Sequence, residues 1–501
     1  MFNTNAILLC DTYKQVHVKM FDKGLKNLVS YWVPRKSMFE KAENQKMVFF
    51  GLQAFIQEFL IKYFNDNFFD VPADTIRDTY RKYMNIQIGE GNYGTENIEA
   101  LHKLGYLPLR LRALPEGSKV NMGIPCIELT ATNDDFAWLV QWVECILQSE
   151  LWKTCNHATI GNMYYKLAKY WYGQNADDSI DPRNAFSDFG MRGMSCMNEA
   201  ARCSAAWLLS ANKTSTVCAL PYIDKFYDAD CSYNHFGQGA VSTEHAVISA
   251  NYANGTDEIT FLKRMLTDTY KNTSFSCLGD TYDYWNFVDV VLPTCKNEIM
   301  EHNGKLLVRP DSGDQYETVI KTVQKLWNMF GGTTNSKGFK VLDPHIGVIL
   351  GDGCTLNVVA KIWKKLNSMQ FAANNVIFGV GAFCFTAIFE GDKMIVNTRD
   401  TYGVAMKASY GVFLKGDGEL REVMIYKDPK TDTSKLKKSH KGLVFVEKTK
   451  DGFKYTDGML SKDYYEYGKT HVDAMRVVFE DGRMYNRETF TTIRERLATE
   501  D

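Results

Sequence analysis

The chain has 501 residues and a formal net charge of −2; 45% of its residues are hydrophobic and 24% are charged. This length suggests two or three domains, and this balance is typical of a soluble globular protein. The sequence has neither the basic excess of a nucleic-acid binder nor the run of about 18 apolar residues that a membrane span needs. Residues 1–10 lack the pattern of a signal peptide, so we expect a cytoplasmic protein without nucleic-acid or membrane partners.

Twelve cysteines are scattered along the chain without a C-x-x-C pair or the paired spacing of a zinc site. The chain is also far larger than the small secreted domains that depend on disulfides. We therefore expect reduced thiols, and the sequence assigns no metal-ligating residues.

The predicted elements differ between the flanks of the chain and its middle. Residues 1–145 combine aromatic-rich segments with helical stretches such as 48–64, and residues 401–501 contain strands such as 443–446 and a final helix. Neither flank has a complete α/β pattern. We therefore predict that the two flanks form one composite α+β domain, beside an irregular α/β barrel formed by residues 146–400.

The middle segment repeats a strand, a polar turn and a helix, which is typical of a parallel α/β fold. Its apolar runs are continuous, as expected for strands that are buried on both faces. The four clearest runs are 274–278, 305–308, 346–350 and 376–378. Apolar positions at helical spacing then predict helices over 316–330 and 356–366, the second one capped by Thr355.

Polar residues and glycines follow these strands directly. The carboxyl ends of parallel strands share one edge of a sheet, where ligands bind. We therefore expect six residues to converge there: Asp280, Arg309, Asp311, Gly351, Asp352 and Gly381. Arg309 suits phosphate, and Asp311, two residues later, suits ribose hydroxyls or Mg²⁺. Gly379-x-Gly381 lies where a barrel often holds phosphate on backbone N–H groups, although any tight turn also uses such glycines.

Two further segments contain candidate ligand-binding side chains. Arg192 lies in the glycine-punctuated loop 185–195, just before a predicted helix, where it suits an anion; a surface arginine is the alternative. Phe189 in the same loop is either a stacking platform or a core side chain. His245 lies in a polar segment at a predicted helix start, where it is either catalytic or a structural or exposed histidine.

These residues, in this order, resemble the motifs of the nicotinamide phosphoribosyltransferase family, a group of type II phosphoribosyltransferases. Asp11–His17 resembles its D-S-Y-K-x-x-H segment and Asp188–Gly193 its D-F-G-x-R-G. Asp280–Asp283 resembles D-S-Y-D, and Arg309–Gly313 is identical to R-P-D-S-G. Further counterparts lie at Glu244–His245, Asn335–Lys340, Gly351–Gly353, Thr398–Asp400, Tyr426–Pro429 and Glu466–Gly468. The resemblance spans nearly the whole chain, and it implies an α/β barrel with a composite domain, assembled as a homodimer.

The family joins nicotinamide to phosphoribosyl pyrophosphate, and the resemblance implies a role for each matching residue. The pyridine would stack between Phe189 of one subunit and Tyr13 of the other, with Asp11 in the same N-terminal motif as Tyr13. Asp311 would bind the ribose hydroxyls, and Asp280 would support them. The remaining lining of the mononucleotide would come from Gly351, Asp352, Gly381 and Ala382.

Positive charge for the phosphate groups is the second part of this implied site. Pyrophosphate and phosphate would be held by Arg192, His245 and Arg309. Further cations, from the adjoining subunit or domain, would be Arg35, Arg399, Lys407 and Lys427. Mg²⁺ and the arginines would stabilise the charge on the leaving pyrophosphate, and no general base is needed because the pyridine nitrogen carries its own lone pair. ATP would act as a co-substrate that phosphorylates His245.

Three departures from the family's motifs affect these assignments. Residues 214–216 read T-S-T where the nicotinamide enzymes have T-D-T, so Ser215 replaces the carboxylate expected to accept the carboxamide N–H. The choice between amide and acid is therefore open. The turn after Gly381 reads Ala-Phe instead of continuing as a glycine run, and the segment 382–399 is longer than in the family, which affects the placement of Arg399.

Three functions are compatible with the sequence. The leading interpretation is a nicotinamide phosphoribosyltransferase of NAD salvage. The second is a nicotinate phosphoribosyltransferase, which Ser215 alone favours. The third is a non-catalytic dimeric binding protein, and the joint retention of Arg192, His245, Arg309, Asp311 and Asp352 argues against it.

Overall fold

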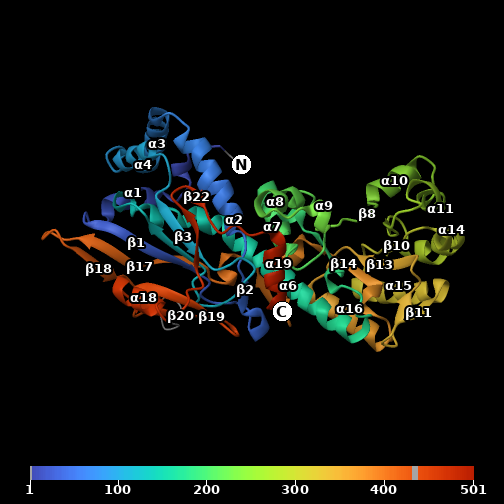
Figure 1. The fold of residues 1–501 in the computed structure, drawn as a ribbon. Helices are drawn as coiled ribbons and strands as arrows, with labels where there is room; N and C mark the ends of the chain where they lie inside the picture. The colour runs from blue at the N-terminus through green and yellow to red at the C-terminus, as the bar shows by residue number, and fades with distance from the viewer. Residues whose placement is uncertain (1–2, 432–437, 501) are drawn as a thin grey trace. The chain divides into compact units, whose positions relative to one another are not determined.

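A computed structural model describes residues 3–431 and 438–500 (Figure 1). The chain forms two compact units. The first consists of Met1–Thr159, Ile223–Ala229 and Thr398–Asp501, and the second of Ile160–Tyr222 and Asp230–Asn397. The first change of unit lies inside the helix α6 (Glu144–Asn175), later than the expected position at 145, because a continuous helix has no turn signal there.

The first unit is built around a seven-stranded antiparallel sheet in the order β18-β17-β1-β5-β3-β21-β22. Its strands are β1 (Leu25–Val33), β3 (Leu109–Ala113), β5 (Ile127–Ala131), β17 (Ala405–Leu414), β18 (Leu420–Met424), β21 (Arg476–Glu480) and β22 (Arg483–Met484). N-terminal β1 pairs with C-terminal β17, drawn blue and orange in Figure 1, and β3 pairs with β21. Strands from both ends of the chain share one sheet, which confirms the predicted composite α+β unit.

Short ladders and helices complete the first unit. β2 (Lys46–Val48) pairs with β4 (Lys119–Asn121), and β19 (Leu443–Thr449) pairs with β20 (Gly452–Met459). Its helices include α1 (Thr12–Met20), α2 (Leu52–Phe55), α3 (Ala73–Ile88), α4 (Glu96–Leu104), α18 (Ser461–Gly468) and α19 (Phe490–Thr499). The predicted strand at 443–446 is part of β19, and the predicted final helix is α19.

The second unit contains a seven-stranded parallel sheet in the order β7-β6-β14-β13-β10-β9-β8. Its strands are β6 (Phe186–Phe189), β7 (Lys213–Thr214), β8 (Val241–Ser242), β9 (Phe275–Leu278), β10 (Leu306–Arg309), β13 (Ile346–Leu350) and β14 (Val376–Gly381). A parallel bridge joins Lys213 of β7 to Gln238, in the segment that leads into β8. The strands follow one another in chain order around a barrel, and β14 returns to β6, which confirms the predicted irregular α/β barrel.

Helices cover the outside of this barrel. They include α7 (Met197–Trp207), α10 (His245–Ala253), α11 (Glu258–Arg264), α15 (Gln315–Phe330) and α16 (Leu356–Ser368). Trp363 of α16 makes edge-to-face contacts with Phe186 of β6 and Phe378 of β14, at 5.5 and 5.2 Å between ring centres. The helices predicted over 316–330 and 356–366 are confirmed as α15 and α16, and the hydroxyl of Thr355 caps α16 by accepting the N–H of Val358.

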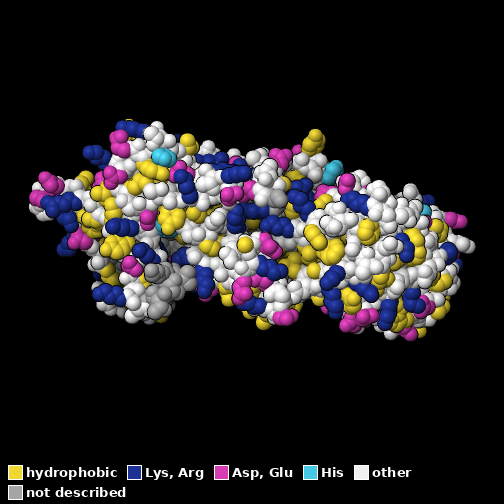
Figure 2. Space-filling model, turned by 90° about the horizontal axis from the view of Figure 1, so that it is seen from below, with side chains coloured by type: hydrophobic (Ala, Val, Ile, Leu, Met, Phe, Trp, Pro, Cys, Tyr) yellow, Lys and Arg dark blue, Asp and Glu magenta, His cyan; other side chains and the backbone are white. Residues whose placement is uncertain are grey.

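The surface that Figure 2 shows carries Lys and Arg side chains interspersed with Asp and Glu side chains. In the part of the chain that the structure describes, no helix is both long and apolar enough to cross a bilayer. No disulfide joins any of the twelve cysteines in that part.

Candidate active site

The carboxyl edge of the barrel brings together most of the residues that the sequence selected. Arg309 ends β10, and its Nη2 donates a hydrogen bond to Asp311 Oδ1 at 3.0 Å. Its guanidinium carbon lies 5.8 Å from the centre of the Phe189 ring, at the end of β6. A Cβ on Gly351, directly after β13, would lie 2.7 Å from Arg309 Nε, so a side chain there would displace the guanidinium. Four predicted residues from three strands therefore form one cluster.

Arg309 retains hydrogen-bonding capacity for a ligand. Its side chain is 17% exposed, and its Nε is buried with no hydrogen-bond partner among the described residues. Nη1 reaches the hydroxyl of Ser242 only at 3.5 Å. A buried donor without an acceptor costs about 1–3 kcal/mol. An anionic acceptor such as phosphate would remove this cost through a charge-assisted hydrogen bond.

His245 is the first residue of α10, directly after the N-cap residue Glu244. Its Nε2 lies 3.3 Å from Oδ1 of Asp280, which stands at the carboxyl end of β9. The Asp280 side chain is 4% exposed, whereas the His245 side chain is 50% exposed. A buried carboxylate therefore orients an imidazole that a ligand can reach, which suits a histidine that meets a phosphate group.

Phe189 is half-buried at the end of β6, and its ring lies against β14. A Cβ on Gly379 of β14 would collide with this ring, so the glycine makes the close approach possible. With Arg309 on the same side of the barrel, the ring has a cation beside it and is not enclosed in the core. This arrangement favours the stacking platform over the core alternative.

Asp188 is a buried support that sequence reasoning did not select. Its side chain accepts hydrogen bonds from four donors: Gly190 N, Ser204 Oγ, Thr214 Oγ1 and Thr216 Oγ1. Burial raises the pKa of Asp188, and these hydrogen bonds oppose the rise. Its backbone oxygen accepts the N–H of Ser215 at 2.8 Å, so Asp188 ties the ends of β6 and β7 together. The available signal was its place directly before Phe189 in the D-F-G-x-R-G match.

The other predicted residues of the second unit lie at the same edge. Ser215 follows β7 and is exposed. Arg192 is exposed in a short turn after β6, and a Cβ on the next residue, Gly193, would collide with Ala382. The Arg192 turn therefore lies against the turn of Gly381 and Ala382 that follows β14.

The carboxylates at this edge do not form a metal cage. Asp280 contacts His245 and Asp311 contacts Arg309, while Asp352 accepts a hydrogen bond from Gln315 at 3.1 Å. Across residues 3–431 and 438–500, no group of three or more His, Cys, Asp or Glu side chains is arranged to hold a metal. Mg²⁺ commonly binds through one or two carboxylates plus substrate phosphates, and this edge can supply those carboxylates.

Three predicted residues of the first unit, Asp11, Tyr13 and Lys407, lie near Glu144, which sequence reasoning also missed. The Glu144 carboxylate contacts two ammonium groups: Lys14 at 2.6 Å and Lys407 at 3.6 Å. Tyr13, beside Lys14 on α1, is 54% exposed. Asp11 is the N-cap residue of α1 and accepts a hydrogen bond from the thiol of Cys145, which follows Glu144. The N-terminal motif and a C-terminal lysine thus meet at one acidic side chain.

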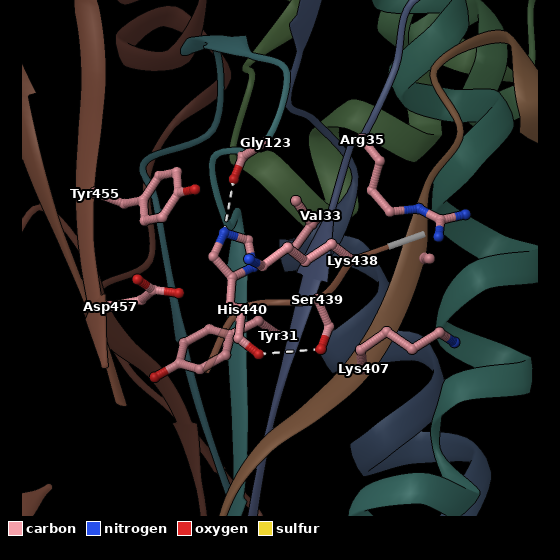
Figure 3. A pocket seen from close by; sticks show the side chains of 11 residues that line it. Tyr31, Val33, Arg35, Gly123, Lys407, Lys438, Ser439, His440, Tyr455 and Asp457 are labelled. Atoms are coloured by element: carbon pink, nitrogen blue, oxygen red, sulfur yellow. Dashed lines mark hydrogen bonds between the residues drawn. The ribbon is translucent and has the colours of Figure 1, made fainter. Parts of the chain in front are cut away.

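A cavity of about 460 Å³ in the first unit is lined by two of the predicted cations. Figure 3 shows Arg35 and Lys407 on one side and Tyr31, Tyr455 and Asp457 on the other. Burial, followed by the charge of neighbouring Arg399, lowers the pKa of Arg35. Three of the four predicted cations of this unit, Arg35, Arg399 and Lys407, are therefore close together.

The fourth cation, Lys427, lies next to the lining of this cavity. Its backbone N–H donates to Ser439 Oγ at 2.8 Å, and its backbone oxygen accepts the N–H of Ser439 at 3.0 Å. His440, the next residue, contacts the backbone oxygen of Gly123 through Nε2 at 2.9 Å, and burial lowers the pKa of its imidazole. The cavity therefore combines lysine and arginine cations with aromatic side chains, a His440 imidazole that is neutral at pH 7, and the carboxylate of Asp457.

The carboxyl edge of this α/β barrel brings together an arginine suited to phosphate, a carboxylate suited to ribose hydroxyls and an aromatic platform. This combination is typical of proteins that bind a phosphoribosyl group. The family model "Nicotinate phosphoribosyltransferase (NAPRTase) family" matches residues 184–483, and "Nicotinamide phosphoribosyltransferase, N-terminal domain" matches residues 5–84. The chain therefore belongs to the nicotinate phosphoribosyltransferase family.

Two curated relatives match nearly the whole chain. A nicotinamide phosphoribosyltransferase of Acinetobacter baylyi is 34% identical over 519 residues, covering 99% of this chain and 98% of that protein. A nicotinamide phosphoribosyltransferase of Xanthomonas campestris is 26% identical and covers 98% of this chain and 97% of its own length.

Two solved structures share the fold. Nicotinate-nucleotide pyrophosphorylase from Pyrococcus furiosus has a TM-score of 0.58 and 14% identity, covering 99% of this chain and 95% of that one. Human nicotinic acid phosphoribosyltransferase has a TM-score of 0.52 and 12% identity, covering 98% of this chain and 93% of that one. At these identities the likeness concerns the fold.

Proposed function

We propose that this protein transfers the phosphoribosyl group of phosphoribosyl pyrophosphate to nicotinamide, forming nicotinamide mononucleotide and pyrophosphate in NAD salvage. The observation that carries the proposal is Arg309, whose buried Nε lacks an acceptor while its Nη2 contacts Asp311 and its guanidinium lies beside Phe189. One cluster thus offers an anion site, a carboxylate for ribose hydroxyls and an aromatic platform. The full-length relatives named nicotinamide phosphoribosyltransferase support nicotinamide as the acceptor.

In the proposed reaction, the chain positions the reactants and stabilises charge. Phe189 holds the pyridine ring so that its nitrogen lone pair attacks C1 of the ribose. The bond from C1 to the pyrophosphate oxygen breaks as the bond to nitrogen forms, and its electron pair leaves with pyrophosphate. Arg309, Arg192 and the N-terminal end of α10 stabilise this leaving group. Asp311 is a carboxylate that could help to hold Mg²⁺, which would neutralise further negative charge on the leaving group.

Coupling to ATP is a second part of the proposal. The contact of His245 Nε2 with buried Asp280 supports it, because the carboxylate orients an exposed imidazole towards incoming phosphate. An imidazole nitrogen attacks the γ-phosphorus of ATP, and ADP leaves with the electron pair of the broken bond. Water later attacks the phosphohistidine and releases phosphate.

A shared active site is the third part. We propose a homodimer in which Tyr13 of one subunit covers the pyridine on Phe189 of the other. Exposure of Tyr13, and its position beside the lysines around Glu144, support this role. Arg35, Arg399, Lys407 and Lys427 would add positive charge to the phosphate groups of the partner's substrate.

Nicotinate is the alternative acceptor, because Ser215 is exposed where the nicotinamide enzymes' motif has an aspartate. Steady-state release of pyrophosphate, measured with each pyridine at saturating Mg²⁺, tests both functions. We expect nicotinamide to be the better substrate by kcat/KM. A higher kcat/KM for nicotinate would establish the alternative, and no product with either pyridine would refute the enzyme assignment.

A further inference from the structure

Two lysines stand at the amino-terminal ends of barrel strands, away from the carboxyl edge. Lys213 is the first residue of β7, and Lys305 directly precedes β10. Going round the barrel, β8 and β9 separate β7 from β10 on one side, and β6, β14 and β13 separate them on the other. The two lysines therefore stand on opposite walls. We call Lys213 and Lys305 the lumen lysine pair.

The side chain of Lys213 points into the barrel. Its neighbour Thr214 donates a hydrogen bond to Asp188, which also binds Ser204 of the outer helix α7. Thr214 and Asp188 thus face the helices. Because successive side chains of a strand point to opposite faces, Lys213 faces the lumen together with Ser187, its partner in β6.

The side chain of Lys305 also points into the barrel. Arg309 contacts Phe189 on a strand that is not its neighbour, so Arg309 faces the lumen. Lys305 is four residues earlier and shares that face by alternation. A Cβ on Gly347 of β13 would lie 3.4 Å from Lys305 Cδ, so the lysine stem lies along the inner surface of the neighbouring strand.

Neither ammonium group of the lumen lysine pair has an acceptor among the described residues. Burial is the first cause that lowers the pKa of Lys213, and the charge of Lys305 is the second. Burial also lowers the pKa of Lys305, against the opposing charge of Asp343, whose carboxylate is hydrogen-bonded to His345 at 2.7 Å. Within the described residues, neither ammonium group donates a hydrogen bond or forms an ion pair. Two like charges held in this way destabilise each other.

Small residues face the lumen on the strands next to each lysine. Ser187, Ser276 and Gly347 face inward near the amino-terminal end, where the interior of a filled barrel commonly has bulky branched side chains. Leu307, in register between Ser276 and Gly347, is a bulky side chain on the same face, so a ligand would lie beside it against the small residues. Two cations suit a doubly charged anion better than a single carboxylate, because each ammonium group can then pair with its own negative charge.

We propose that the lumen lysine pair binds a small oxyanion of the phosphate class at the amino-terminal end of the barrel. The site is separate from the Arg309 cluster at the carboxyl edge, and it does not depend on the reaction proposed above. Bound phosphate joins the two opposite walls of the barrel through ion pairs, so its occupancy stabilises the second unit.

The first test follows the lysines directly in the full chain. Reductive ¹³C-methylation labels lysine amines while preserving their charge, and Lys213→Met and Lys305→Met identify the two NMR signals. Addition of inorganic phosphate should raise the pKa of both amines, and acetate at equal ionic strength should leave them unchanged. The proposal would be overturned if phosphate left the pKa of both amines unchanged, or if acetate raised it equally.

The second test measures stability in an Arg309→Ala background, which removes the central cation of the Arg309 cluster at the carboxyl edge. Millimolar phosphate should raise the Tm of this protein but not that of its Lys213→Met, Lys305→Met derivative. Lys321→Met, at a 58% exposed side chain on α15, is the matched control and should respond like the parent. An equal rise in Tm with and without the lumen lysine pair would contradict the proposal.

Discussion

Ser215 occupies an exposed position at the end of β7, and its backbone N–H is held by the oxygen of Asp188. Its hydroxyl group can both donate and accept a hydrogen bond, whereas an aspartate only accepts and repels a carboxylate. In the proposed site a serine should therefore discriminate weakly between the amide and the acid of the pyridine.

We expect Ser215→Asp to raise the preference for nicotinamide over nicotinate. A hydrogen bond to a charged group contributes about 1–3 kcal/mol, which corresponds to a change of roughly 5- to 150-fold in the ratio of kcat/KM values. Steady-state kinetics with both pyridines measure that ratio. Ser215→Asn introduces a side chain of nearly the same size as aspartate but without charge, so it should change the ratio much less. An unchanged ratio in the aspartate variant would mean that residue 215 does not contact the exocyclic group.

His245 should become phosphorylated when ATP is added, because buried Asp280 orients its exposed imidazole. His245→Ala should abolish stimulation by ATP and leave slower, uncoupled synthesis. Asp280→Asn should weaken the stimulation by ATP without removing the phosphorylated residue. Mass spectrometry under conditions that preserve phosphohistidine locates the label, and a label found only at other residues would refute this role.

At the scale of elements, the first helix after β2 depends on one glycine and one distant carboxylate. The helical stretch expected over 48–64 begins later, because β2 extends to Val48 and Gly51 adopts φ +111° before α2 starts at Leu52. The carboxylate of Glu116 accepts the N–H groups of Gly51 and Gln53 at 2.9 and 2.5 Å. Apolar periodicity alone did not reveal this turn, because the residues on both sides of it are buried, and the predicted helical stretch therefore started too early.

Glu116 predicts a pH dependence of stability. Burial raises its pKa to about 7, so the folded chain binds this proton more tightly than the unfolded chain, where the pKa is about 4.3. Protonated Glu116 therefore stabilises the folded chain. This contribution to the free energy of unfolding is present in full below about pH 4.3 and is lost as the pH rises through 7, and its size is about 1.4 kcal/mol for each unit by which the two pKa values differ. Glu116→Gln should flatten the fall in the free energy of unfolding between pH 5 and 8.

Denaturant titrations across that pH range measure the effect. Glu317→Gln, at an exposed side chain of α15, is the control and should retain the wild-type slope. A slope that is equally steep in the Glu116→Gln protein would show that Glu116 is ionised throughout this range.

At the scale of the whole molecule, the proposed dimer predicts complementation between two inactive variants. Tyr13→Ala and Arg309→Ala proteins, mixed after dissociation and reassociation, should form heterodimers with one doubly altered and one intact site. With random reassociation of an isologous dimer, about a quarter of wild-type activity should return. Each aromatic face contributes on the order of 0.5–1.5 kcal/mol to pyridine stacking in addition to the burial of its apolar area, so the loss of Tyr13 should also weaken nicotinamide binding in its own assay.

Each variant reassociated with itself is the control for this experiment and should stay inactive. If heterodimers form, as native mass spectrometry would detect, and activity does not return, Tyr13 acts within its own chain and the shared site is wrong.

The sequence alone predicted four of the barrel strands, two of its helices and the ligand-binding edge of the barrel, because these follow from local patterns. Continuous apolar runs identified the strands around Leu306–Arg309 and Ile346–Leu350, and the polar residue after each strand had to lie at the carboxyl edge of a parallel sheet. The motif Arg309–Gly313 indicated a phosphate-binding arginine and a carboxylate suited to ribose hydroxyls. The sequence predicted that the two flanks share one composite domain, but it predicted neither the pairing of β1 with β17 nor the register of that pairing.

Only the tertiary structure decided which side chains support those residues. No local sequence pattern marks Asp188 as a support, and only the structure shows that four donors surround its carboxylate. Glu144 likewise has no local sequence signal, and only the structure shows that Lys14 and Lys407 contact it. The lumen lysine pair has the same origin, since strand order around the barrel places Lys213 and Lys305 on opposite walls. Buried charge depends on contacts between residues far apart in the chain, and those contacts exist only once each unit has folded.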